Sequence, residues 1–197
     1  RPRMRLGLRI IYGVLIALGV FVGSCSSARA EPAPLVLARE VVPTLVEDLR
    51  YATSDNFLKR AVYTDSRCWL KPSVARKLAA AAIALAERRP GSRLKVWDCA
   101  RPRAVQWAMW RIMPDPKYVA DPRWGSRHNT GSAVDLTIVD AEGREVEMPT
   151  GFDDFSRRAW HNAKTTPAAA GNRALLLEVM AAAGFAPMRT EWWHYEG

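Results

Sequence analysis

The sequence is poor in histidine and cysteine, with three of each among 197 residues. It has no internal repeat and no low-complexity segment, so nothing in it indicates a repeat protein or a disordered chain. No alternation of aromatic and basic residues suggests nucleic-acid binding. About 167 residues remain once the predicted N-terminal leader is set aside, and that length fits one domain with its own core.

The N-terminus has the pattern of a secretory leader. Four arginines lie within the first nine residues, and an apolar run follows over residues 10–22. That run is shorter than the roughly 20 residues of a transmembrane helix. Ala28-Arg29-Ala30 before Glu31 indicates cleavage, which predicts a signal peptide over residues 1–30 and an exported protein of the periplasm or cell surface.

Two alternatives to simple cleavage remain. The segment Val22-Gly23-Ser24-Cys25 resembles a lipoprotein cleavage box, which would place an acyl anchor on Cys25 and attach the protein to a membrane. A permanent N-terminal anchor helix is the other.

The leader carries five arginines and no acids, so removing it lowers the net charge from +9 to 9 − 5 = +4, an ordinary value for solubility. We expect a tether over residues 31–44 and a catalytic domain over residues 45–197.

Two of the three histidines lie beside carboxylates in two separate segments. The first segment runs from Ser126 to Asp135 and contains His128, and the second is Glu191-Trp192-Trp193-His194. His128, Asp135 and His194 offer two imidazoles and a carboxylate, a set that suits one catalytic zinc ion and leaves its fourth position for water. Glu191 is then available as a base for that water. The third histidine, His161, is left out of the set.

The spacing within the first segment predicts a hairpin. Asn129-Thr130-Gly131 is typical of a turn, and the residues after it alternate as in a strand. A hairpin centred between Gly131 and Ser132 would put His128 directly opposite Asp135, with Cβ atoms roughly 4.5–5.5 Å apart. Glu191 and His194 are three residues apart and would face opposite sides of a regular strand, so we infer a bulge or strand end at Trp192-Trp193.

The elements around these segments follow from local signals. Pro72 and the alanine-rich run to Arg89 predict a helix that stops at Pro90-Gly91, and residues 104–112 predict a second. Residues 94–97 predict a buried strand. A third helix is expected to begin at Asn172 as its cap and to end before Gly184, with a closing strand over residues 188–194.

Cysteine usage agrees with export. With Cys25 in the leader, Cys68 and Cys99 remain as an even pair in an oxidising compartment. A disulfide between them would close a loop of about thirty residues and contribute roughly 3–4 kcal/mol in the chain-entropy model. Two buried thiols are the alternative.

The motifs together resemble one family. Ser-x-His-x6-Asp followed far downstream by Glu-x-x-His is similar to the zinc D,D-peptidases that include the VanX-type D-alanyl-D-alanine dipeptidases. The segments 51–57, 98–102 and 151–153 resemble that family's opening, arginine and amine-binding motifs. The resemblance covers roughly residues 45–197 and is much more specific than a lone short motif.

The resemblance implies roles for four further residues. Arg101 would stabilise the tetrahedral oxyanion, because a guanidinium stays charged and presents a fixed fork of donors. Asp153 would pair with the substrate ammonium. Ser126 would form a hydrogen bond with the substrate backbone, and Tyr51 would line the mouth of the site. Without the resemblance, turn formation and core packing would be the simpler readings of Asp153, Ser126 and Tyr51.

The sequence therefore predicts an α+β domain, with a mainly antiparallel sheet flanked by helices and zinc at one end of the sheet. The expected activity is hydrolysis of the small peptide D-alanyl-D-alanine by a metal-activated water. A zinc D,D-carboxypeptidase or endopeptidase acting on longer peptidoglycan stems is the first alternative. A catalytically silent zinc-stabilised binding module is the second, although such a module would need neither Glu191 nor Arg101.

Overall fold

A computed structural model describes residues 34–197. The predicted leader, its cleavage site and Cys25 lie outside the described residues. Within residues 34–197, no helix combines the length and the apolar character needed to cross a bilayer. The described part is an α+β fold, as the sequence predicts.

The main sheet has five strands in the order β2-β4-β5-β7-β6, and only the β2–β4 pair is parallel. The bounds are β2 (Val46–Glu47), β4 (Arg93–Asp98), β5 (Ala133–Val139), β6 (Ala186–Met188) and β7 (Glu191–Glu196). A separate antiparallel pair joins β1 (Val36–Leu37) to β3 (Trp69–Leu70). The prediction of a mainly antiparallel sheet is confirmed.

Among residues 34–197, four helices and three short 3-10 helices accompany the strands. They are α1 (Ala38–Val41), η1 (Arg50–Ala52), α2 (Pro72–Arg88), α3 (Arg103–Ile112), η2 (Arg127–Thr130), η3 (Arg157–Ala159) and α4 (Pro167–Ala182). The predicted helices α2 and α3 are confirmed to within a residue or two. The predicted start of α4 is wrong: the Thr166 hydroxyl caps it by accepting from Ala169 N–H at 3.1 Å. Asn172 instead lies inside the helix and donates to the Glu147 carbonyl.

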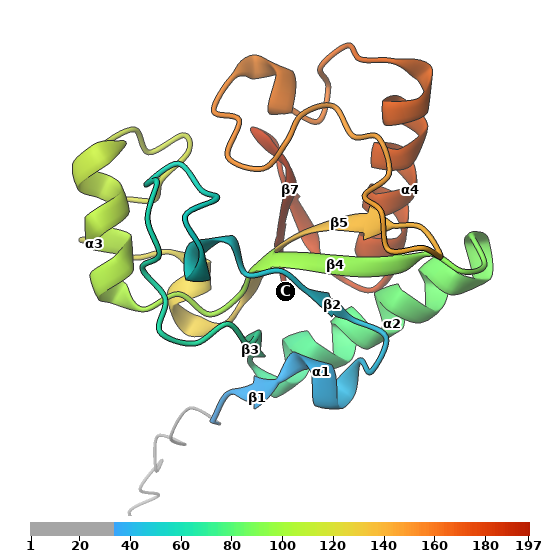
Figure 1. The fold of residues 1–197 in the computed structure, drawn as a ribbon, viewed down its shortest axis with the longest axis horizontal. Helices are drawn as coiled ribbons and strands as arrows, with labels where there is room; N and C mark the ends of the chain where they lie inside the picture. Colours follow the sequence, from blue (N-terminus) through green and yellow to red (C-terminus); the bar gives the residue numbers. More distant parts are fainter. Residues whose placement is uncertain (1–33) are drawn as a thin grey trace, which may run out of the picture. The chain divides into compact units, whose positions relative to one another are not determined.

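Helices α2 and α4 pack against each other, and α2 also contacts β4 while α4 contacts β5. Helix α3 lies beyond the C-terminal end of β4 (Figure 1). Every residue of β5 is buried, so this central strand is covered on both faces. The leucines of α2 and the apolar residues of β4 and β5 form the core between helices and sheet. Each fully buried leucine there contributes about 1.5–3 kcal/mol relative to an exposed one.

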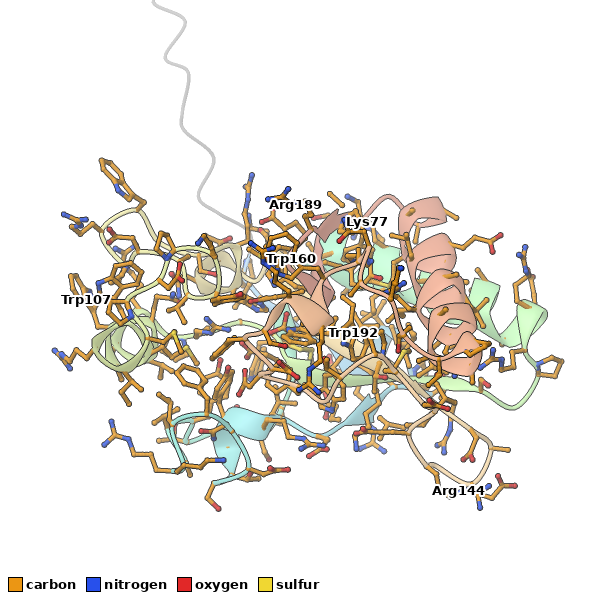
Figure 2. The ribbon with its side chains drawn as sticks, turned by 90° about the horizontal axis from the view of Figure 1, so that it is seen from above. Lys77, Trp107, Arg144, Trp160, Arg189 and Trp192 are labelled. Atoms are coloured by element: carbon orange, nitrogen blue, oxygen red, sulfur yellow. A yellow bond between two sulfur atoms is a disulfide. The ribbon has the colours of Figure 1, made fainter. Side chains whose placement is uncertain are left out.

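Aromatic side chains from β4, from β7 and from the loop that contains Phe152 pack together in the interior. Trp97 on β4 packs on Phe152 and on Trp192, with ring centres 5.2 and 5.8 Å apart. Trp192 points into the interior, whereas Trp107 on α3 projects outward (Figure 2). The indole N–H of Trp192 donates to Thr150 Oγ1 at 2.9 Å, so this large ring is buried without an orphaned donor.

The segment expected as a tether is part of the fold from Val36 onward. Ala38 is fully buried, and its N–H donates to the Cys68 carbonyl at 2.8 Å. Val42 and Leu45 are buried in the same core. The expectation of a tether over residues 31–44 therefore misses that Val36 and Leu37 pair with β3 and that β1 and α1 contact α2.

Candidate active site

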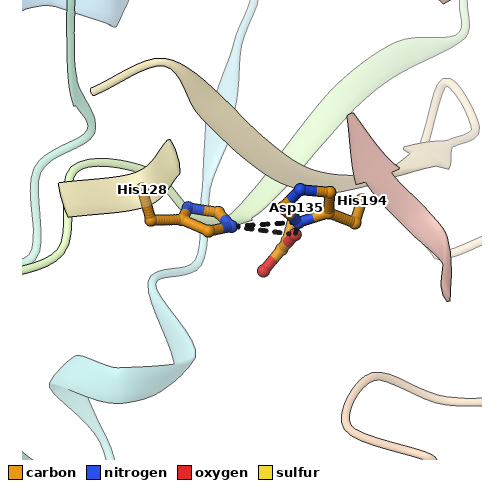
Figure 3. Close-up of side chains that lie close together, drawn as sticks. All are labelled: His128, Asp135 and His194. Atoms are coloured by element: carbon orange, nitrogen blue, oxygen red, sulfur yellow. Dashed lines mark hydrogen bonds and ion pairs between the residues drawn. The ribbon is translucent and has the colours of Figure 1, made fainter. Parts of the chain in front are cut away.

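Three potential metal ligands converge on one point from three elements: His128 from η2, Asp135 from β5 and His194 from β7 (Figure 3). Their ligand atoms all lie within 4.8 Å of one another. The Nε2 atom of His128 is 3.1 Å from Nδ1 of His194 and 3.3 Å from Oδ1 of Asp135. The remaining pair, His194 Nδ1 and Asp135 Oδ1, is 2.9 Å apart.

The predicted hairpin is wrong, and a different pairing brings the ligands together. Asp135 on β5 lies directly opposite His194 on β7, so the two side chains share one face of the sheet. His128 belongs to η2, which begins with a capping box between Ser126 and Asn129. Asn129 is therefore a capping residue of a short helix, and it does not form a hairpin turn.

Gly131 turns the chain from η2 into β5. Its φ of 64° lies in the left-handed region, which side chains with a Cβ adopt at a cost. A Cβ there would also lie 2.8 Å from the Leu35 side chain and 3.1 Å from the Lys71 nitrogen. Glycine is therefore required at this junction, and the junction sets the position of His128 relative to Asp135.

The inferred irregularity near Trp192-Trp193 is present in the pairing of β6 with β7. Pro187 pairs with Tyr195, and the next residue, Met188, pairs with Glu191. One step along β6 thus corresponds to four along β7. This shift allows Glu191 and His194, three residues apart, to line the same cavity.

The donor atoms fit a divalent cation of the zinc type. The Nδ1 atom of His128 lies 2.8 Å from the Cys99 carbonyl oxygen, which can only accept, so Nδ1 carries the proton and Nε2 presents a lone pair. Four ligands around tetrahedral zinc at about 2.0–2.1 Å lie roughly 3.3 Å from one another. The observed separations of 2.9–3.3 Å are close to that value.

The charges at the centre agree with this fit. Burial alone would raise the pKa of Asp135, but His128 and His194 lower that pKa well below its usual range. Burial also opposes protonation of His194, yet its hydrogen bond to Asp135 raises its pKa to about 10. These interactions favour positive charge beside the Asp135 carboxylate, and a bound cation would supply it.

Glu191 lies at the start of β7 with 5 % of its surface exposed, and it lines the same cavity. Burial raises the pKa of Glu191 to about 8 against the opposing effect of His194, and the Asp135 charge raises it further. A carboxyl with such a pKa can take up and release a proton near neutral pH, as acid-base catalysis requires.

Arg101 approaches the cavity from the loop after β4. Its Nε and Nη2 atoms donate to Oδ2 of the fully buried Asp98 at 3.0 and 2.5 Å. Burial lowers the pKa of Arg101, but Asp98 more than offsets this effect and raises it well above its ordinary value. The guanidinium is therefore a fixed positive charge at the cavity wall.

Asp153 is held in a defined orientation at another part of the cavity wall. Its Oδ1 accepts from the Tyr51 hydroxyl at 2.9 Å and its Oδ2 from the Phe57 N–H at 3.0 Å. The backbone of Asp153 has φ of 60°, an uncommon conformation for a residue other than glycine. Burial raises the pKa of Asp153 to about 6, although both hydrogen bonds oppose the shift.

One cavity of about 450 Å³ joins all these groups, a volume within the roughly 300–1,000 Å³ range of small-molecule sites. Every predicted metal, catalytic and substrate-binding residue lines it: Tyr51, Arg101, Ser126, His128, Asp135, Asp153, Glu191 and His194. Ser126 Oγ accepts from the His128 N–H at 3.2 Å, which leaves its hydroxyl proton free to donate.

Comparison with known proteins identifies the family. The sequence model described as D-ala-D-ala dipeptidase matches residues 31–197. The chain belongs to this family.

The relatives of the chain include proteins named D-alanyl-D-alanine dipeptidase from three bacteria. The Escherichia coli K12 protein is 38 % identical over 157 residues, which cover 79 % of this chain and 80 % of the relative. The Streptomyces coelicolor and Enterococcus faecium proteins are 34 % and 33 % identical, and each match covers 79 % of this chain and 87 % of the relative. The chain is therefore a peptidase of the D-ala-D-ala dipeptidase family.

Asp98 and Gln106 hold Arg101 by hydrogen bonds, and the sequence alone does not predict either contact. Asp98 lies in the arginine motif itself, and its Oδ1 accepts from the Tyr63 hydroxyl at 2.6 Å and from the Cys99 N–H at 2.9 Å. Gln106 on α3 accepts from Arg101 at 2.9 Å. The one sequence signal for Gln106 is a polar side chain on the same helical face as Met109, three residues later.

Two further predictions concern the disulfide and the third histidine, His161. The structure joins Cys68 to Cys99 by a disulfide, and the Cys99 carbonyl is the acceptor that orients His128. His161 packs on Tyr195, with ring centres 6.1 Å apart. Because Tyr195 follows His194 on β7, it points to the opposite face of the strand, and His161 is not part of the metal cluster found among residues 34–197.

Proposed function

We propose that this chain is a zinc-dependent dipeptidase that hydrolyses the peptide bond of D-alanyl-D-alanine. The observation that carries the proposal is the convergence of three ligand atoms, from His128, Asp135 and His194, in one cavity with Glu191. Family membership and the names of the relatives support the choice of substrate.

One zinc ion per chain would be held by His128, Asp135 and His194. When bound, zinc lowers the pKa of a water molecule to about 7 and polarises a carbonyl group. The chain's contribution is the orientation of the ligands: the Cys99 carbonyl fixes the His128 ring, and Glu196 Oε1 lies 3.8 Å from Nε2 of His194.

Glu191 and Arg101 would carry the chemistry that the chain itself supplies. Glu191 takes the proton of the attacking water and passes it to the leaving nitrogen, a role supported by its burial and its raised pKa. Arg101 faces the carbonyl oxygen, where negative charge develops as water attacks. Removing a donor from such a position typically costs about 10²–10³-fold in turnover.

Asp153 would bind the ammonium group of the dipeptide. A buried ammonium without a partner is costly, and the hydrogen bonds from Tyr51 and Phe57 hold the Asp153 carboxylate ready to receive it. The Tyr51 ring forms part of the cavity wall, and the Ser126 hydroxyl can donate to the substrate backbone. This arrangement would restrict the site to peptides with a free amine at this position.

We further propose that the protein is exported to the periplasm or cell surface. The basic and apolar N-terminal segment supports a signal peptide, with lipidation of Cys25 as the alternative to cleavage after Ala30. The Cys68–Cys99 pair supports an oxidising compartment.

Hydrolysis assays test this function. Purified protein should release D-alanine from D-alanyl-D-alanine, lose activity with a chelator and regain it with zinc. N-acetyl-D-alanyl-D-alanine should be a very poor substrate, because acetylation removes the charge that Asp153 binds. Efficient cleavage of the acetylated dipeptide or of a longer stem peptide would instead indicate a D,D-carboxypeptidase. Zinc binding without any hydrolysis would indicate a binding module.

A further inference from the structure

Gln106 is a fully buried polar side chain on α3 that touches both Arg101 and the cavity wall. Its Oε1 atom accepts from Nη1 of Arg101 at 2.9 Å, and its Nε2 atom donates to the Ala120 carbonyl at 2.7 Å. Ala120 lines the active-site cavity. Because the Ala120 carbonyl can only accept, the amide of Gln106 has one satisfactory orientation, and its oxygen must face Arg101.

The hydrogen bonds to Asp98 do not by themselves prevent the guanidinium of Arg101 from rotating in its own plane. Both of its bonds, from Nε and from Nη2, end on the same atom, Oδ2. The guanidinium could therefore pivot in its plane about that one oxygen. Tyr51 restricts tilting out of the plane, since its ring centre lies 5.4 Å from Cζ of Arg101. The contact of Nη1 with Gln106 supplies a second fixed point in the plane.

The donors of Arg101 can be counted. A guanidinium has five N–H groups. Asp98 takes two and Gln106 takes one, which leaves one N–H on each terminal nitrogen. Arg101 lines the cavity and is otherwise almost completely buried, so these two N–H groups are the ones available to a substrate oxygen.

We propose that Gln106 is a positioning residue that fixes the in-plane orientation of Arg101 toward the reacting carbonyl. The inference rests on the proposed role of Arg101 as the group that stabilises the developing oxyanion. Since the donors of Arg101 matter most when charge develops, loss of Gln106 lowers turnover and leaves binding of the ground state nearly unchanged.

The test uses Gln106→Met in the zinc-loaded protein, because methionine has a similar length and offers no strong acceptor. We expect kcat to fall roughly 10–100-fold, since a small misplacement of a catalytic group can cost about 10²-fold. We expect KM to change less than about threefold, and zinc content to stay at one per chain. Affinity for a tetrahedral phosphinate analogue of the dipeptide should fall by the same factor as kcat/KM.

Val105→Ala is the matched control, because Val105 is a buried neighbour on α3 that does not line the catalytic cavity. Its kcat and its affinity for the phosphinate should stay within threefold of wild type. Gln106→Leu provides a second apolar replacement should Gln106→Met fail to fold. A folded Gln106 variant with kcat and phosphinate affinity within threefold of wild type overturns the inference.

A double-mutant comparison separates this inference from the proposed function. In an Arg101→Lys background, Gln106→Met should have little further effect, because the group that it positions is gone. Additive losses would show that Gln106 acts independently of Arg101 and would overturn the inference alone. If Arg101→Lys itself keeps wild-type turnover and phosphinate affinity, the proposed role of Arg101 fails, and the inference fails with it.

Discussion

The buried carboxyl of Glu191 should make the metal-free protein less stable as pH rises, and Glu191→Gln should remove that dependence. Burial raises the pKa of Glu191 from 4.5 to about 8. Between these values the folded protein keeps a proton that the unfolded chain releases, so the free energy of unfolding falls with increasing pH. The stability that the folded protein gains by keeping the Glu191 proton is fully present below pH 4.5 and fully lost above about pH 8.

The size of the effect follows from the shift. At about 1.36 kcal/mol per pKa unit, the rise in the pKa of Glu191 from 4.5 to about 8 corresponds to about 5 kcal/mol as an upper value. That amount is a large fraction of the stability of an ordinary domain, roughly 5–15 kcal/mol. Glutamine has nearly the same shape and carries no charge, so Glu191→Gln should equal wild type near pH 4.5 and exceed it by several kcal/mol near pH 8.

Urea unfolding of chelator-treated protein at pH 5 and pH 8 measures this difference directly. Ionisable groups that do not interact with Glu191 titrate alike in both proteins, so their effects cancel in the comparison. Glu87→Gln, at an exposed position on α2, is the control and should show no such pH dependence. A Glu191→Gln advantage that is the same at both pH values would refute the reasoning. Zinc should reduce the advantage, because a nearby cation favours the carboxylate.

Four further outcomes are expected. His128→Ala should lose zinc by elemental analysis, whereas His161→Ala should retain one zinc per chain. Glu191→Gln should also retain zinc while its turnover falls by about 10²–10⁴-fold or more; near-wild-type activity would place the base elsewhere. KM for the dipeptide should rise as pH falls below about 6, where Asp153 becomes protonated, and a pH-independent KM would argue against an Asp153–ammonium pair. Mass spectrometry of non-reduced exported protein should show Cys68 linked to Cys99, and two free thiols would contradict this.

Much of the site was readable from the sequence because its chemistry uses scarce residues. With only three histidines, the two that stand beside carboxylates were natural candidates, and the structure brings His128 and His194 together with Asp135. The way they come together was not readable. The local turn signal at Asn129 favoured a hairpin, but Asp135 pairs with a strand that lies 59 residues later in the chain. Such long-range pairing leaves no local pattern.

The fold was predictable where local signals decide, and less so elsewhere. Pro72 and the alanine-rich run that follows define α2 almost to the residue. The start of α4 was missed because Thr166-Pro167 is the stronger cap, and Asn172 uses its side chain to hold Glu147. Gln106 escaped notice because its importance depends on Arg101 and Ala120, whose contacts with it exist only in the folded protein.

The position of β7 after β6 along the chain has a consequence for biosynthesis. His194 and Glu191 both lie on it, so a growing chain that has reached only β6 holds two of the three metal ligands and lacks the proposed base. Ribosomes add about 5–20 residues per second, and the sheet cannot receive β7 until that strand has been made. A nascent polypeptide that stops before β7 would therefore contain no complete hydrolytic centre, however well its earlier strands had folded.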